Sequence, residues 1–303
     1  MIVGFVGLGA MGGAIASRLV AGGQRMVVHD KSPERAKLFE GKAQIAVSSR
    51  AVADAADVVF TCLTSPQTYE EAVFGPQGII GGSKIRTYIH AGTSESALLE
   101  RLETAFAAQG VDVLDAPVTG GVARGVNGTL TVMVAGKRKV FDDMMPLFLN
   151  YGTKVVHVSD RVGAAQRLKH VNSMLSAANL AIACEALLVA HKAGLSLDAT
   201  LDVLNNGTGQ SIATLDKIPK QVFTRAFNHG GAIELMIKDI RAFIGAAHDF
   251  DVPAPMCEAV VSAFVKAADE LGGKVDVTAV MRSIERAAGF ELPVVEPGAT
   301  TPA

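Results

Sequence analysis

The fold of this chain is decided by its first residues, Ile2-Val-Gly-Phe-Val6 followed by Gly7-Leu-Gly9-Ala-Met-Gly12. The first five residues are mostly apolar and predict a short buried strand, while residues 14–20, after the glycines, have the periodicity of a helix. A G-x-G-x-x-G turn between a strand and a helix is typical of a dinucleotide-binding loop, where the backbone approaches a pyrophosphate at the helix N-terminus. The stretch therefore predicts a Rossmann-type domain that binds NAD or NADP.

A second predicted strand, residues 25–29, is followed by Asp30, about 20 positions after the last glycine of the turn. An acidic residue at this place accepts the ribose hydroxyls of NAD and repels the 2′-phosphate of NADP. The cation Lys31 follows directly and would tolerate that phosphate. We therefore expect NAD as the cofactor, with NADP as the alternative.

Strand and helix patterns continue to alternate as far as residue 160, as in a mainly parallel α/β sheet. Residues 57–63 are apolar almost throughout, the pattern of a strand covered on both faces. We expect Ser94 to cap a helix, and a hairpin-like pair of strands to flank another helix. The expected strands are 44–48, 57–63, 87–91, 111–114, 129–134 and 154–158, and the expected helices are 95–109 and 140–149.

After residue 160 the pattern is helical, with runs at 163–193, 197–206, 232–250, 254–271 and 277–289. The predicted fold is an α/β Rossmann-type N-terminal domain with a mainly parallel sheet, joined by a long helix to an all-α C-terminal domain. We expect the first domain to span 1–162 and the second, for substrate binding and dimerisation, to span 163–292. The Pro-, Gly- and Thr-containing tail, 293–303, is expected to be disordered.

The long helix predicted after Gly163 carries two lines of residues at helical spacing. One line is apolar and predicts a core stripe: Leu168, Val171, Leu175, Ala178 and Ile182. The other is polar and shares one face: Lys169, Asn172, Ser173 and Ser176. The polar line either faces a site or is a solvated face, and the spacing alone does not decide between them.

Composition limits the classes of function. A net charge of −2 with scattered Lys and Arg argues against nucleic-acid and membrane-surface partners. The 3 cysteines have no paired or metal-ligand spacing and are typical of free thiols in a reducing cytoplasm. The most apolar run, 177–190, is interrupted by Glu185 and is too short to span a bilayer. We expect a cytoplasmic protein with no bound metal and no membrane segment.

A second motif, Asp115-Ala-Pro-Val-Thr119-Gly-Gly121, follows the predicted strand at 111–114. A Thr-Gly-Gly turn offers one hydroxyl and two unhindered backbone N–H groups, which suits a carboxylate. An ordinary glycine-rich crossover loop is the alternative.

With these motifs in view, the chain resembles the β-hydroxyacid dehydrogenase family, which is related to 6-phosphogluconate dehydrogenase. Four motifs agree in order over nearly the whole chain. They are the cofactor turn Gly4–Gly12, the substrate-carboxylate motif Asp115–Gly121 with Gly128-Thr-Leu130, the lysine motif Gly163–Ser173, and Lys238-Asp239 followed by Val252-Pro-Ala-Pro255.

The resemblance implies an NAD(P)-dependent oxidoreductase that transfers hydride to or from a small 3-hydroxy carboxylic acid or semialdehyde, of the 3-hydroxyisobutyrate or tartronate semialdehyde kind. Lys169 would be the general acid/base, since a lysine whose pKa is lowered by its surroundings serves both directions. The substrate would be held by Thr119, Gly120, Gly121, Asn172 and Ser173. The cofactor would contact Gly7, Leu8, Gly9, Ala10, Met11, Gly12, Asp30, Lys31, Leu63, Thr64, Thr93 and Lys238.

The chain departs from the family pattern at Thr64 (usually Pro), Thr119 (usually Ser), Ala165 (usually Gly) and Ser173 (usually Asn). Decarboxylating relatives carry a His where Asn172 stands, and imine-reducing relatives usually lack the lysine. A non-catalytic cofactor-binding sensor or scaffold is the alternative from another class. The resemblance and the apolar helices of the second half predict a homodimer or homotetramer.

Overall fold

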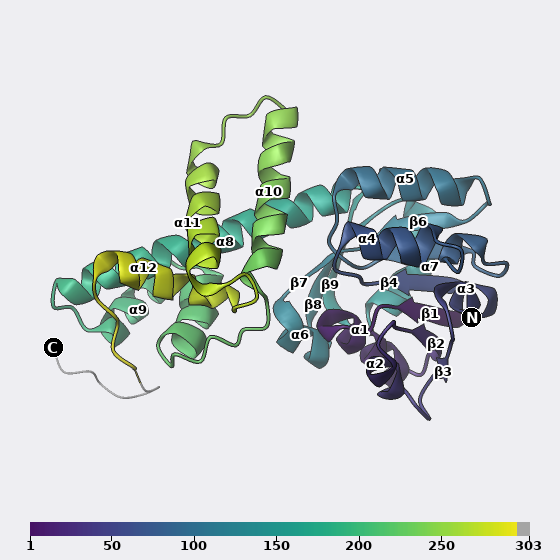
Figure 1. Cartoon of the computed structure of the whole chain (residues 1–303), viewed down its shortest axis with the longest axis horizontal. Coiled ribbons are helices and arrows are strands. Elements are labelled where there is room, and N and C mark those ends of the chain that lie inside the picture. The colour runs from purple at the N-terminus through teal and green to yellow at the C-terminus, as the bar shows by residue number, and fades with distance from the viewer. Residues whose placement is uncertain (296–303) are drawn as a thin grey trace. The chain divides into compact units, whose positions relative to one another are not determined.

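The computed structural model describes residues 1–295, which form two compact units that meet inside one long helix, between Lys169 and His170 (Figure 1). The N-terminal unit is built on one nine-stranded sheet, and the C-terminal unit is helical. This is the predicted fold class: a mainly parallel Rossmann-type sheet followed by a helical domain. The predicted tail, 293–303, falls largely on residues 296–303, which lie outside the described part of the chain.

The sheet of the N-terminal unit has the strand order β3-β2-β1-β4-β5-β6-β8-β7, with β9 paired to β8. Its first six strands are parallel and follow the order of a dinucleotide-binding fold. The strands are β1 (Ile2–Val6), β2 (Arg25–His29), β3 (Gln44–Ile45), β4 (Val58–Thr61), β5 (Thr87–His90), β6 (Asp112–Asp115), β7 (Val118–Thr119), β8 (Leu130–Ala135) and β9 (Gly152–Ser159).

Helices cover both faces of this sheet, because successive strand residues point to opposite sides and both sides are apolar. Side chains of α1, α2 and α7 pack on one face, and those of α3, η1 and α5 on the other. The helices of this unit are α1 (Ala10–Ala21), α2 (Pro33–Lys37), α3 (Ser49–Ala55), α4 (Pro66–Tyr69), η1 (Glu70–Phe74), η2 (Ile79–Gly81), α5 (Ser96–Ala107), α6 (Gly121–Asn127) and α7 (Arg138–Phe148).

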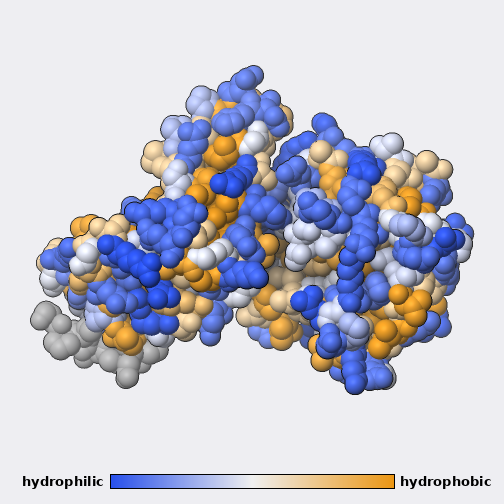
Figure 2. All heavy atoms as spheres, viewed as in Figure 1, coloured by the Kyte–Doolittle hydropathy of each residue, from blue (hydrophilic) through white to orange (hydrophobic). Residues whose placement is uncertain are grey.

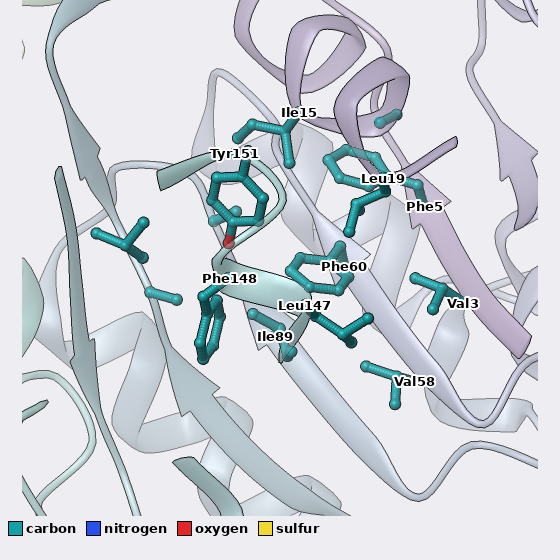
Figure 3. Packing of buried hydrophobic residues seen from close by; sticks show 14 of the residues in the cluster. Val3, Phe5, Ile15, Leu19, Val58, Phe60, Ile89, Leu147, Phe148 and Tyr151 are labelled. Atoms are coloured by element: carbon teal, nitrogen blue, oxygen red, sulfur yellow. The ribbon is translucent and has the colours of Figure 1, made fainter. Parts of the chain in front are cut away.

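An aromatic cluster fills the first of these two cores (Figure 3). The rings of Phe5 and Phe60, on the neighbouring strands β1 and β4, stack with their centroids 5.7 Å apart. Tyr151 meets Phe60 edge to face at 6.4 Å, and Leu19 of α1 packs into the same cluster. This packing holds the start of α1, and therefore the glycine turn before it, against the middle of the sheet.

Two predictions for this unit are wrong, and one strand was not predicted. The expected hairpin of 129–134 with 154–158 is instead a parallel pair, β8 with β9, joined by the crossover helix α7. The unpredicted strand is β7, which pairs antiparallel with β8 and, with two residues, has no readable periodicity. Helix α5 begins at Ser96 and its N-cap is Glu95, so Ser94 is not the cap.

The C-terminal unit packs its helices around one apolar core. Its longest element, α8, begins after Gly163 and ends before Gly194, whose φ of +79° is the left-handed conformation expected after a helix end. The elements are α8 (Ala164–Lys192), α9 (Leu197–Asn206), the π-helix η3 (Ala213–Val222), α10 (Ile233–Asp249), α11 (Pro255–Leu271), η4 (Val277–Ala279) and α12 (Val280–Ala288).

The apolar line predicted as the core stripe of α8 is largely exposed. Val171, Leu175 and Ile182 are 40%, 59% and 56% exposed, and the residues that α8 contributes to the core are instead Met174, Ala177, Leu180 and others on a different face. Apolar atoms accordingly reach the surface of the helical unit among polar ones (Figure 2). The prediction failed because helical spacing identifies an apolar face but not what covers it.

Helix α8 is longer than the apolar run recognised in the sequence. It has 29 residues and a hydropathy of 1.7, so by length and composition it meets the criterion for a membrane-crossing helix. However, 56% of its most apolar window is buried, and the buried residues belong to the core of the helical unit. A core helix of a globular unit accounts for the same features.

Candidate active site

A pocket of about 520 Å³ opens at the carboxyl ends of β1, β2 and β4, entirely within the N-terminal unit. This is the point where strand order reverses, and open α/β sheets bind their ligands there. Six residues predicted to contact the cofactor line it: Gly7, Gly9, Asp30, Lys31, Leu63 and Thr64.

The glycine turn shows two kinds of constraint. A Cβ atom at Gly12 would lie 2.0 Å from the carbonyl oxygen of Gly7, so the protein's own packing excludes any larger residue there. At Gly9, in contrast, the nearest atom to such a Cβ would be 3.9 Å away, on Arg35. The protein's own atoms therefore leave the space beside Gly9 open, and Gly9 lines the pocket. A pyrophosphate approaching the N-terminus of α1 fits that space.

Asp30 ties the glycine turn to the end of β2. Its side chain is 8% exposed, and its carboxylate accepts hydrogen bonds from the backbone N–H groups of Leu8 (2.6 Å) and Ser32 (2.8 Å). Arg35 lies 3.9 Å from the same carboxylate, and Lys31 forms an ion pair with Glu71 across the pocket lining. The end of the pocket that follows β2 thus carries the fixed carboxylate of Asp30, the cation of Arg35 and the ion pair of Lys31 with Glu71.

Several residues of this pocket were not predicted from the sequence. They come from loops and helices that follow β2, β3 and β4, where no motif marks them: Arg35, Ser48, Thr68, Glu71 and Gln77. Among them, only Arg35 could be suspected as a pocket residue from the sequence, because it lies in α2, shortly after Asp30.

The loops after β4 and β5 are held by one buried tyrosine. The hydroxyl of Tyr69 accepts a hydrogen bond from the backbone N–H of Leu63 at 3.0 Å. A Cβ atom at Gly92 would lie 2.1 Å from the same hydroxyl, so the loop that carries Thr93 packs directly on it. The ring of His90 stacks on Tyr69 at 4.6 Å, which is a structural contact at the end of the sheet.

The other residues of the glycine turn differ in how deeply they are buried. Leu8 is buried against the first core, Ala10 is the exposed first residue of α1, and Met11 is partly buried against the same core. Cys62 lies beneath the turn, where burial raises the pKa of its thiol to about 12, and this keeps the thiol neutral.

The Thr-Gly-Gly turn joins β7 to α6. Thr119 is paired with Thr131 of β8, and the two glycines that follow have φ values of +131° and +77°. Such positive φ values favour glycine. The turn is therefore rigidly set on the sheet next to the strand end that carries Asp115.

Lys169 stands in the second turn of α8, the part of this helix that belongs to the N-terminal unit. The first turn of α8 is fixed by Asp115, which is fully buried and accepts the backbone N–H of Gln166 at 3.0 Å. Burial raises the pKa of Asp115 to about 7, although hydrogen bonds from Gln166, Gly163 and Ala165 act to lower it.

The other predicted site residues lie in the helical unit and form a group of their own. Asp239 accepts a hydrogen bond from Ser173 at 3.1 Å and lies 3.3 Å from the ammonium of Lys238. Asn172 lies on the same helix, one residue before Ser173 and partly buried. One turn further along α8, Ser176 accepts a hydrogen bond from the buried Lys217 at 2.8 Å. The polar line of α8 is therefore hydrogen-bonded to two other helices of its unit.

No group of three or more His, Cys, Asp or Glu side chains that could hold a metal ion occurs within residues 1–295. The three cysteines of the chain are free thiols.

Comparison with known proteins agrees with this architecture. Residues 2–159 match the family model for the NAD-binding domain of 6-phosphogluconate dehydrogenase, and residues 163–284 match the model for the NAD-binding part of NADP-dependent 3-hydroxyisobutyrate dehydrogenase. The 2-(hydroxymethyl)glutarate dehydrogenase of Eubacterium barkeri is 32% identical over 295 residues, which cover 96% of this chain and 97% of that protein.

Two solved structures are similar over most of the chain. One is Psf3 in complex with NADP⁺ and 2-OPP, with a TM-score of 0.84 at 27% identity, covering 93% of this chain and 100% of that one. The other is 3-hydroxyisobutyrate dehydrogenase of Mycobacterium tuberculosis with L-serine, with a TM-score of 0.84 at 25% identity, covering 94% and 99%. The N-terminal unit is thus an NAD(P)-binding domain, and the chain belongs to the β-hydroxyacid dehydrogenase family of NAD(P)-dependent oxidoreductases.

Proposed function

We propose that this protein transfers hydride between NAD(P) and a small 3-hydroxy carboxylic acid or the matching semialdehyde, with Lys169 as the general acid/base. One observation supports this most strongly. A single compact unit carries the nucleotide pocket, the Thr119–Gly121 turn and Lys169.

The chemistry requires a proton to leave or reach the oxygen that is bonded to the carbon exchanging hydride. When bound, the nicotinamide ring accepts hydride from the alcohol carbon or returns it to the aldehyde carbon. Lys169 would take the hydroxyl proton in oxidation and give it back in reduction. A lysine is suited to this work because its ammonium and amine forms are both available when its surroundings adjust its pKa.

The carboxylate of the substrate would be held by the hydroxyl of Thr119 and the backbone N–H groups of Gly120 and Gly121. These donors are fixed by the β7–β8 pairing and by two left-handed glycines, so little ordering is needed on binding. A donor set of this kind binds a carboxylate without a formal positive charge. Asn172 and Ser173 would help to position the substrate.

The names of two relatives favour the same substrate class. Both 2-(hydroxymethyl)glutarate and 3-hydroxyisobutyrate carry a CH₂OH group on the carbon next to a carboxylate. That shared group is a 3-hydroxy acid. We expect this chain to act on an acid of that kind in the cytoplasm, with NAD preferred over NADP because Asp30 lies at the ribose end of the pocket.

A panel of small 3-hydroxy acids and semialdehydes, assayed with both cofactors, tests the proposal. The acid that is turned over should lose at least about a hundredfold in kcat/KM when its carboxylate is replaced by a neutral carboxamide, because charge-assisted hydrogen bonds are worth about 1.5–3 kcal/mol each. Equal kcat/KM for the acid and its carboxamide would contradict the carboxylate-binding role of the Thr-Gly-Gly turn.

A further inference from the structure

A buried bridge, formed by the side chain of Gln166, links three segments of the N-terminal unit. Its amide nitrogen donates to the carboxylate of Asp115 at 2.6 Å and to the carbonyl oxygen of Gly92 at 3.2 Å. Its amide oxygen accepts the backbone N–H of Ser94 at 2.9 Å. Gln166 and Asp115 are both fully buried. The bridge therefore joins the loop after β5, the end of β6 and the first turn of α8.

Only a carboxamide satisfies these three partners together. Ser94 offers a donor, whereas Gly92 and Asp115 offer acceptors, so the side chain must present an oxygen on one side and an N–H₂ group on the other. A carboxylate would face two acceptors with no proton, and an apolar side chain would leave all three buried groups without this partner. A buried polar group that loses its partner costs roughly 1–3 kcal/mol.

The bridge also holds the loop that carries Thr93 and the helix turn that carries Lys169 in fixed positions relative to each other. Thr93, which we expect at the cofactor, lies between Gly92 and Ser94, the two residues that Gln166 holds. Lys169 follows Gln166 by three positions on α8, less than one helical turn away. Asp115, the third partner, begins the segment that ends in the Thr-Gly-Gly turn. Movement of any one of these elements against the others breaks at least one of the three hydrogen bonds.

We propose that Gln166 and Asp115 are positioning residues that hold the lysine of α8 in register with the cofactor loop Gly92–Ser94. This rests on the proposed function, in which Lys169 moves the proton. Neither residue is required to touch the substrate. They affect the reaction by setting the position of the Lys169 ammonium. A displacement of that ammonium by about 1 Å is enough to reduce turnover by about a hundredfold.

The test is a double-mutant cycle between Gln166 and Lys169. The variants are Gln166→Met, which keeps the length of the side chain and removes both polar groups, Lys169→Met, and the double variant. We expect Gln166→Met alone to lower kcat between tenfold and a hundredfold, with the dissociation constant of the cofactor changed less than threefold. In the Lys169→Met background the same substitution should change kcat less than twofold, since residues that act through one group are not additive.

Arg167→Met is the matched control. Arg167 is the next residue of α8, and its guanidinium pairs with Glu100 of α5 at 3.2 Å. Its variant should keep kcat within about twofold of wild type. A thermal unfolding curve for each variant separates loss of folded protein from loss of turnover.

Two outcomes separate the two proposals. If Gln166→Met lowers kcat by the same factor with and without Lys169, the positioning role is wrong and the bridge is merely structural. If Lys169→Met retains wild-type kcat, the proposed function itself fails. Should Gln166→Met not fold, Gln166→Glu is the second variant. It keeps the oxygen that accepts from Ser94 and replaces the N–H₂ donor that faces Asp115 and Gly92 with an oxygen. It enters the same cycle with the same expected coupling.

Discussion

At the scale of single residues, the nucleotide pocket combines carboxylates and cations at the end that follows β2. Asp30 is held by the backbone N–H groups of Leu8 and Ser32, so it shapes the glycine turn as well as lining the pocket. Arg35 and Lys31 line the same end of the pocket. We expect the balance between these charges to decide between NAD and NADP.

Replacement of Asp30 by Ala should weaken NAD more than NADP. Loss of a hydrogen bond to a charged group costs about 1.5–3 kcal/mol, which corresponds to a rise of at least about tenfold in the dissociation constant of NAD. The rise for NADP should be smaller, because the carboxylate no longer repels its 2′-phosphate. Fluorescence titration of both cofactors measures this, with Glu34→Ala, an exposed carboxylate on α2, as the control. Equal losses for both cofactors would show that Asp30 does not face the ribose.

Asp115 gives the folding stability a defined pH dependence. Burial raises its pKa to about 7 in the folded protein, against a value near 4 in the unfolded chain. Between these two values the folded protein holds a proton that the unfolded chain has released. The contribution of this group to the free energy of unfolding therefore falls as pH rises from about 4 to about 7, and is constant above that range.

The variant Asp115→Asn removes this titration. The slope of its free energy of unfolding against pH should be less negative than that of wild type between about pH 4 and 7. Its stability should be lower overall, because the carboxamide N–H₂ would face the donors of Gln166. Urea unfolding at several pH values measures both effects. Identical slopes for the two proteins would mean that Asp115 is not protonated in that range.

The residues of the nucleotide site could be predicted where a motif carries them and not elsewhere. Gly7, Gly9 and Asp30 follow from backbone geometry and charge that any dinucleotide loop requires, and the structure places all three on the pocket. Gln77 comes from a loop without a motif. Gln166 lies inside a motif, yet its partners are 72 and 51 positions away in the chain, so only the folded structure shows what it joins.

At the scale of elements, helix positions were easier to predict than strand pairing. Most long helices were recognised because apolar spacing repeats over several turns. The pairing of β8 with β9 was predicted as hairpin-like, although a helix was expected between the two strands. That helix is α7, and a strand–helix–strand unit of this kind makes a parallel pair.

Helix α8 differs from the prediction in a way that bears on assembly. Its apolar residues Leu175, Ile182 and Val189 repeat every seven positions and are 59%, 56% and 70% exposed. An apolar line of this period is typical of a helix that packs on another helix. The exposed line supports the predicted homodimer or homotetramer, with α8 in the contact between copies.

The double variant Leu175→Glu with Ile182→Glu should therefore lower the molar mass of the protein in solution, because four carboxylates per dimer would be placed in an apolar contact. Val203→Glu, at an exposed apolar position of α9, is the control and should keep the wild-type mass. Light scattering coupled to size-exclusion chromatography gives the mass. A double variant with unchanged mass, or a monomeric wild-type protein, would contradict the role of α8 in assembly.

At the scale of the whole molecule, the division into an α/β unit and a helical unit could be predicted because the strand signal stops near residue 160. The nucleotide pocket, the Thr-Gly-Gly turn and the lysine all belong to the first unit. The second unit contains a separate polar group of Asn172, Ser173, Lys238 and Asp239. Family membership and cofactor class follow from the whole chain, whereas the choice of substrate depends on side chains that no motif marks.

The central claim is that Lys169 moves the proton, and the variant Lys169→Met tests it most directly. We predict a fall in kcat of at least about a hundredfold, as expected for loss of a general acid/base, with the dissociation constant of the cofactor within about twofold of wild type. Lys192→Met, at the far end of the same helix, is the control and should keep wild-type turnover. Wild-type kcat in the Lys169→Met protein would contradict the proposed mechanism.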